Sequence, residues 1–190
     1  MERSRSAKES GPVRRAERAA RESYGRLVAY LCAQSGDVAA AEDALSSAFL
    51  SALETWPEQG IPKKPEAWLL QVARRRGVDA VRKSVVREKA EPQVALLIDE
   101  LQEQAPVPDR RLELMFLCAH PSIDASIRAP LMLQVVLGLN AKQIGSAFLV
   151  PPTTMGQRLS RAKKKIKQAR IPFEVEDEAS RIAVTCEAVY

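Results

Sequence analysis

The apolar residues between positions 153 and 170 constrain the fold most strongly. They are separated by four, three, four and three positions, and are Met155, Leu159, Ala162, Ile166 and Ala169. This spacing places them on one side of an α-helix, where they can face a core. The same segment contains seven basic residues and no acidic residue. The pattern therefore predicts an amphipathic helix with a positively charged polar face.

A short helix precedes this one and gives the pair the pattern of a helix-turn-helix. Asn140 can cap the short helix, and Gly145 is small where a second helix must cross closely. Residues 149–152, Leu-Val-Pro-Pro, cannot continue a regular helix and predict the turn. Thr153 is the expected N-cap of the second helix. The apolar residues expected on the short helix are Ile144, Ala147 and Phe148.

A helix of this kind can enter the major groove of DNA with its first turns. Gln157, Ser160 and Arg161 are the expected readers of base edges. A lysine run alone is usually a solvated surface, but its combination with a supporting helix and a proline turn favours DNA binding. Lysines farther along would neutralise phosphates. The full predicted set is Thr153, Thr154, Gln157, Arg158, Ser160, Arg161, Lys163, Lys164, Lys165 and Lys167.

The rest of the chain also has helical patterning, which predicts an all-α fold. Hydrophobic residues make up 46% of the chain and aromatic residues only 5%, which favours an aliphatic, helix-built core. One helix should end near Gly36, a second should begin at the N-cap Asp37 and stop at Pro57, and a third should open at Pro65. Pro130 should start or kink a later helix. The expected apolar stripes of these helices are Tyr24, Leu27, Val28 and Leu31, then Ala41, Leu45, Ala48, Phe49, Ala52 and Trp56, then Trp68, Leu69, Val72 and Ala73, and later Leu112, Met115, Phe116 and Ala119, which precede a break at His120–Pro121.

Two small helical domains joined by an acidic linker account for this pattern. The segments are a disordered leader at 1–14, a helical bundle at 15–90, a linker at 91–107, the helix-turn-helix domain at 108–172 and the start of a C-terminal extension at 173–190. The net charge of +5 agrees with a polyanionic partner.

Several functional classes are disfavoured. The three cysteines are widely spaced and the single His120 precedes a proline, so neither a metal site nor a disulfide framework is predicted. The sequence has no nucleophile motif and no glycine-rich phosphate loop, so we expect no enzyme and no cofactor. No stretch is long and apolar enough for a membrane span, and a cytoplasmic protein is expected.

The N-terminal motifs narrow the class of DNA-binding protein. The sequences AEDALSSAFLSALETW and PEAWLLQVARRRGVDAVRK resemble region 2 of extracytoplasmic function (ECF) sigma factors, and GLNAKQIGSAFLVPPTTMGQRLSRAKKKI resembles their region 4. DRRLELMFLCAHP and IPF are similar to features of a subgroup with an extra C-terminal domain. The resemblance implies a factor that binds core RNA polymerase and promoter DNA, with an anti-sigma factor or the chain's own C-terminal domain as a further partner.

The resemblance also implies roles for individual residues. Region 4 would bind the minus-35 element through the helix at 153–170. The polymerase would be bound by Glu42, Asp43, Leu45, Ser46 and Phe49, although core packing is an equally good interpretation of Leu45 and Phe49. Melted minus-10 DNA would be bound by Lys63, Lys64, Trp68, Arg74, Arg75, Arg76, Arg82 and Lys83. For the arginines and lysines of that helix, the alternative is a solvated charged face.

A repressor or activator remains the main alternative. Such a protein would use its N-terminal helices to bind a ligand or to dimerise, and it would bind DNA without contacting the polymerase.

Overall fold

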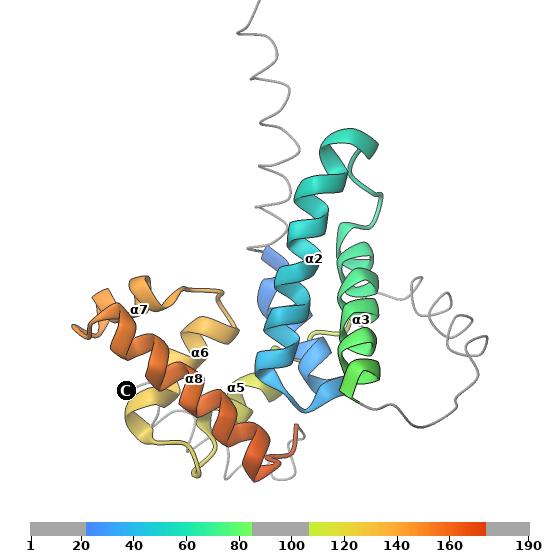
Figure 1. The fold of residues 1–190 in the computed structure, drawn as a ribbon. Coiled ribbons are helices and arrows are strands. Elements are labelled where there is room, and N and C mark those ends of the chain that lie inside the picture. The colour runs from blue at the N-terminus through green and yellow to red at the C-terminus, as the bar shows by residue number, and fades with distance from the viewer. Residues whose placement is uncertain (1–21, 85–106, 174–190) are drawn as a thin grey trace, which may run out of the picture. The chain divides into compact units, whose positions relative to one another are not determined.

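A computed structural model describes residues 22–84 and 107–173, with the side chains of residues 76–84 outside the description (Figure 1). Within these ranges every regular element is a helix, which confirms the predicted all-α class. The helices span residues 22–35, then α2 Val38–Gln59, α3 Pro65–Ser84, α5 Arg111–Ala119, α6 Ala125–Val135, α7 Ala141–Ala147 and α8 Pro152–Ala169. The predicted leader, nearly all of the linker and the extension beyond residue 173 lie outside the described residues.

The chain separates into two compact units. The first consists of Met1–Ser23 and Asp43–Pro108, and the second of Tyr24–Glu42 and Asp109–Tyr190. The break after Pro108 lies close to the start predicted for the second domain. The sequence predicted one helical bundle over residues 15–90, whereas the structure groups Tyr24–Glu42 with the C-terminal helices. This grouping depends on contacts between residues far apart in the chain.

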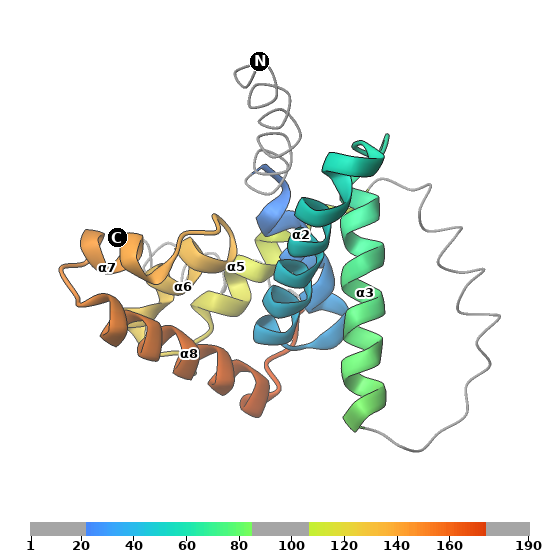
Figure 2. The same cartoon turned by 45° about the horizontal axis from the view of Figure 1, so that its top comes forward.

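Helices α2 and α3 run side by side and form the body of the first unit (Figures 1 and 2). The rings of Trp56 and Trp68 meet edge to face with their centroids 5.5 Å apart, an arrangement that aromatic pairs prefer. The apolar stripe predicted for α2 is buried except at Phe49, which is half-buried. On α3 the buried residues are Leu69, Leu70 and Ala73, while Trp68 and Val72 are half-buried.

The ends of these helices test the predicted caps. Asp37 caps α2 as predicted, because its Oδ1 accepts from the backbone N–H of Ala40 at 3.1 Å. Helix α3 opens at Pro65 as predicted. The prediction that Pro57 stops α2 is wrong, since the helix runs on to Gln59. It ends at Gly60, whose φ of 84° reverses the chain while its N–H bonds the Trp56 carbonyl.

The second unit contains α5 to α8, in which α5 packs on α6, and α6, α7 and α8 pack on one another. Helix α5 ends at Ala119, in agreement with the break predicted at His120–Pro121. Of the two roles predicted for Pro130, starting a helix or kinking it, the first is excluded, because α6 begins at Ala125 after Asp124, which accepts from the Ser126 N–H at 2.9 Å. Pro130 is buried inside α6, where its ring withholds only one backbone donor from the helix.

The helix over residues 22–35 approaches the α6–α7 connection within this unit. A Cβ added to Gly25 would lie 2.1 Å from the Val136 carbonyl oxygen, and one added to Gly138 would lie 3.1 Å from the Tyr24 ring. Gly25 is therefore required for close backbone approach, whereas Gly138 is favoured by its φ of 70°. Of the helices in the described ranges, none combines the length and the apolar character that crossing a membrane requires.

Candidate nucleic-acid interface

The helix-turn-helix is formed by α7, a tight turn and α8. Asn140 caps α7 as predicted, and the cap is reciprocal: its Oδ1 accepts from the Gln143 N–H at 2.9 Å, while its own N–H bonds Gln143 Oε1 at 3.0 Å. Such a capping box satisfies two backbone donors at the helix start. The short α7 is therefore fixed at its N-terminus.

Gly145 lies where the turn passes close to α7. Its carbonyl accepts from the Val150 N–H at 2.8 Å, and a Cβ on Gly145 would lie 2.6 Å from the Val150 carbonyl oxygen. This confirms the prediction that a small residue is needed here. Leu149 turns the chain with a φ of 54° and is exposed, so the turn depends on an uncommon backbone conformation for a residue with a side chain.

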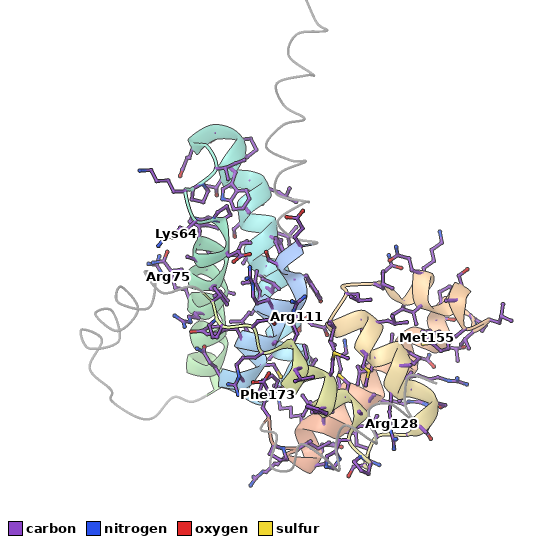
Figure 3. The ribbon with its side chains drawn as sticks, turned by 180° about the vertical axis from the view of Figure 1, so that it is seen from behind. Lys64, Arg75, Arg111, Arg128, Met155 and Phe173 are labelled. Carbon is purple, nitrogen blue, oxygen red and sulfur yellow. The ribbon has the colours of Figure 1, made fainter. Side chains whose placement is uncertain are left out.

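Helix α8 is divided into an apolar and a polar side. Met155, Leu159, Ala162 and Ile166 are buried as predicted, whereas Ala169 is exposed. Met155 is labelled at this helix in Figure 3. The predicted DNA-binding residues of α8 that are exposed are Thr153, Gln157, Arg158, Ser160, Arg161, Lys164, Lys165 and Lys167. Thr154 is half-buried.

Besides that for Ala169, the predictions for three residues of this motif are wrong. Thr153 does not cap α8, because the helix already begins at Pro152 with Pro151 at the N-cap position. A proline at the first helical position loses nothing, since its missing N–H would have had no partner within the helix. Ala147 and Phe148, expected on the buried side of α7, are exposed. Helix α7 ends at Ala147, so only Ile144 and Gly145 are buried.

Two lysines of α8 are paired with acids near the start of α2. Lys163 Nζ lies 2.7 Å from Glu42 Oε2, and Lys167 Nζ lies 2.7 Å from Asp37 Oδ2. The Lys163 side chain is 16% exposed and that of Lys167 is 67% exposed. Lys163 therefore differs from the other predicted phosphate-binding residues, because it points toward the rest of the unit instead of toward solvent.

The second of these pairs changes the ionisation of both partners. Partial burial opposes ionisation of Asp37, but hydrogen bonds from Lys167 and from the Ala40 N–H outweigh it and lower the pKa of the carboxyl. The hydrogen bond to Asp37 in turn raises the pKa of the Lys167 ammonium. Both groups are therefore held in their charged forms at neutral pH.

The basic residues predicted around α3 are only partly described. Lys63, Lys64 and Arg75 are exposed and Arg74 is half-buried. Figure 3 shows Lys64 and Arg75 on the same side of α3. Trp68 is half-buried against Trp56, so one part of its surface remains accessible. The side chains of Arg76, Arg82 and Lys83 lie outside the described residues.

The residues predicted to contact the polymerase have different environments on α2. Leu45 is fully buried and Glu42 is 8% exposed, while Asp43 and Ser46 are exposed. Phe49 is half-buried. The sequence analysis did not identify Leu50 and Leu53 as exposed apolar residues of α2. Their side chains are 63% and 41% exposed. The signal was available, because these leucines fall outside the apolar stripe at Ala41, Leu45, Ala48, Ala52 and Trp56.

The described residues give no sign of a metal centre, since nowhere in them do three or more His, Cys, Asp or Glu side chains form a group suited to a metal ion. Cys32 and Cys118 are fully buried. Burial raises the pKa of the Cys32 thiol to about 12 and also raises that of Cys118. His120 accepts a hydrogen bond at Nδ1 from the Ser122 N–H at 3.1 Å, which gives it a part in the turn after α5.

Comparison with known proteins places a recognised domain at the N-terminal part. Residues 20–85 match the family model for Sigma-70 region 2 and carry that domain, which is a non-enzymatic one. An uncharacterized protein of Rhizobium meliloti (strain 1021) is 38% identical over 162 residues, covering 79% of this chain and 38% of that protein. The chain thus spans about two-fifths of the length of this relative. No solved structure matches the chain.

Proposed function

We propose that this chain, which carries a Sigma-70 region 2 domain at residues 20–85, is a bacterial sigma factor that binds core RNA polymerase and directs initiation at promoters. The match to region 2 is the observation that carries the proposal. The motifs quoted above favour the ECF group and a subgroup with a C-terminal extension, and they favour the cytoplasm as its location. An anti-sigma factor or the C-terminal extension would be a further partner.

The polymerase would bind the exposed face of α2. Asp43, Ser46, Leu50 and Leu53 follow one another at intervals of three and four residues, which puts them on one side of the helix. All four are exposed. Leucines exposed beside polar residues are typical of a surface that a partner covers. Leu45 would support this face from the core instead of contacting the polymerase.

The exposed side of α8 would bind the minus-35 element. Gln157, Ser160 and Arg161 are exposed between the second turn and the middle of the helix, from where side chains can reach base edges. Lys164 and Lys165 lie one turn farther along and are exposed. They would contact phosphates, which provides affinity and salt dependence with little sequence discrimination.

The minus-10 element would be bound at the start of α3. Lys63 and Lys64 just before the helix and Arg75 in its middle supply exposed positive charge, and Trp68 in the first turn offers part of an aromatic surface. Opening DNA in this way requires no bond chemistry, because an unstacked base can stack on a side chain for about 1–3 kcal/mol while cations hold the strand. Arg75 stands where many ECF factors have asparagine, so this chain would hold the strand through charge.

Binding to core RNA polymerase tests the proposal. The Leu50→Ala/Leu53→Ala double variant should bind core polymerase more weakly than the wild type and should support less run-off transcription. Leu112→Ala/Leu137→Ala is the matched control, because it also removes two exposed leucines, at 54% and 59%. Equal losses in the two variants would contradict the assignment of the α2 face. A chain that binds palindromic duplex DNA without binding the polymerase would be a repressor or activator instead.

A further inference from the structure

The turn between α7 and α8 carries an exposed leucine in a backbone conformation that leucine rarely adopts. Leu149 has a φ of 54° and is 94% exposed. A side chain is disfavoured in this left-handed region, which glycine occupies freely. The fold covers almost none of the leucine side chain, so the side chain contributes little packing in return for the strained backbone. A strained and exposed residue of this kind indicates a contact outside the chain.

Backbone hydrogen bonds hold the turn in place on both sides of Leu149. The Phe148 N–H bonds the Ile144 carbonyl at 3.0 Å, and the Val150 N–H bonds the Gly145 carbonyl at 2.8 Å. Both acceptors belong to α7. The conformation of the turn therefore depends on the backbone of its neighbours, and the Leu149 side chain can be removed without loss of these bonds.

The sequence around Leu149 is free of charge. Residues 143–157 contain no acidic and no basic residue, whereas every charged residue from Arg158 to Arg170 is basic. Beside Leu149, Phe148 is 41% exposed and Pro151 is exposed. Phosphates are bound through cations, so this part of the motif is poorly suited to the DNA backbone. It is suited to an apolar group instead.

Leu149 also lies close to the end of α8 that would enter DNA. Pro152 is the first residue of α8 and follows Leu149 by three positions, a length of chain that spans at most about 11 Å. The major groove is about 12 Å wide, and the apolar group that base edges present there is the C5 methyl of thymine. With the first turns of α8 in the groove, the Leu149 side chain is within reach of such a methyl.

We propose that Leu149 contacts a thymine methyl group in the DNA bound by α8 and thereby contributes to sequence specificity. The inference rests on the proposed function of α8. Cytosine and uracil lack this methyl, so the leucine selects thymine through an apolar contact, whereas Gln157 and Arg161 would select bases through hydrogen bonds. Burial of one methyl group corresponds to an affinity difference of about 4-fold.

Replacing thymine by deoxyuridine tests the contact, because deoxyuridine pairs with adenine in the same way and lacks only the C5 methyl. The complex of the full chain with core RNA polymerase first selects duplexes from a random-sequence pool. A selected duplex is then prepared with deoxyuridine at one thymine position at a time, and dissociation constants are measured by fluorescence anisotropy. Leu149→Ala is the test variant. Leu112→Ala is the matched control, because it removes a leucine that is 54% exposed in α5, outside the motif.

In the wild type, deoxyuridine at one position should raise the dissociation constant by roughly 3- to 5-fold. The same replacement should have no effect on Leu149→Ala, while Leu112→Ala should respond as the wild type does. Effects of deoxyuridine on the duplex itself are common to all three chains and cancel in this comparison. An equal response of the wild type and Leu149→Ala at every position would overturn the inference.

A second substitution at the same position separates the contact from a role in folding. Leu149→Gly should also lose the response to deoxyuridine, and it should not lower the urea midpoint of unfolding, because glycine adopts the left-handed conformation freely. A lower midpoint together with an unchanged response to deoxyuridine would show that Leu149 supports the turn, which contradicts the inference.

Lys164→Ala/Lys165→Ala separates failure of the inference from failure of the proposed function, because it removes exposed lysines of α8. If this variant binds the duplex more weakly while the Leu149 variants respond to deoxyuridine as the wild type does, α8 binds DNA and only the inference is wrong. The same holds if Leu149→Ala weakens binding of the polymerase alone. If the lysine variant binds as the wild type does, or if the complex selects no DNA, both are wrong.

Discussion

A pair of glycine-to-alanine substitutions in the helix-turn-helix should have opposite effects on stability. Gly145 lies in α7, where a Cβ would approach the Val150 carbonyl oxygen to 2.6 Å. Gly156 lies in α8, where the nearest atom to a Cβ would be the Ala141 methyl at 3.8 Å. The first distance is too short for two non-bonded atoms, so an alanine at position 145 requires the backbone of the turn to move. The second distance is an ordinary van der Waals contact. Both positions are helical.

The expected magnitudes follow from three contributions. Alanine is favoured over glycine within a helix by about 1 kcal/mol, and this is the main effect expected at Gly156. At Gly145 the same gain is opposed by overpacking, which typically costs about 1–3 kcal/mol. Moving the turn to relieve the contact also weakens the bond from the Val150 N–H to the Gly145 carbonyl, at about 1 kcal/mol. Gly145→Ala should therefore destabilise the motif by about 1–3 kcal/mol.

Native-state hydrogen exchange of the α7 and α8 amides measures the change in local stability of these two helices. Urea unfolding followed by circular dichroism measures the change in the midpoint of global unfolding. Exchange is needed because both described tryptophans lie in α2 and α3, outside the helix-turn-helix. Gly145→Ala should lower protection in α7 and α8, and Gly156→Ala should raise it. Equal stabilisation by both substitutions would refute the close approach of the turn to α7.

Three further predictions concern DNA reading, thiols and pH. Arg161→Ala should weaken recognition of a cognate minus-35 element by about 1–3 kcal/mol and relax its specificity, whereas Lys164→Ala should weaken cognate and scrambled DNA alike; equal losses on both DNAs for Arg161→Ala would exclude base reading. In a variant that retains only Cys32 and Cys118, both thiols should resist a thiol reagent until the chain is unfolded, because burial raises their pKa values; rapid labelling of the native chain would contradict their burial. The folded pKa of Asp37 is lowered, so its contribution to stability is present at neutral pH and is lost as pH falls through the folded pKa. A wild-type advantage over Asp37→Asn that is the same at neutral pH and in acid strong enough to protonate the carboxyl would contradict this.

The features that the sequence predicted well depend on local spacing. The intervals between Met155, Leu159, Ala162 and Ile166 determine which side of α8 is buried, whatever packs against it. Asn140 with Gln143 and Asp37 with Ala40 are caps made within one turn of chain, so their residue types were sufficient to locate them. Gly145 was predicted to be small because the second helix of such a motif must cross closely, and the atom that lies closest is the Val150 carbonyl oxygen of the turn.

The wrong predictions arose where one residue type permits two outcomes. Pro57 lies near the end of α2, where the missing donor matters little, and Gly60 ends the helix instead. Pro152 opens α8 and thereby leaves no capping role for Thr153. Leu45 fitted both the core stripe and the contact pattern that the resemblance implies, and it is fully buried in the structure.

The partner of Lys163 shows what local patterns cannot predict. Within α8, Lys163 is one lysine of a run of three, and its position in the helix places it at the edge of the polar side. Its ion pair joins it to Glu42, which lies 121 positions earlier in the chain. That contact exists only because residues 24–42 pack within the same unit as α8. A charge that the sequence predicts to bind DNA is therefore paired within the chain by tertiary structure.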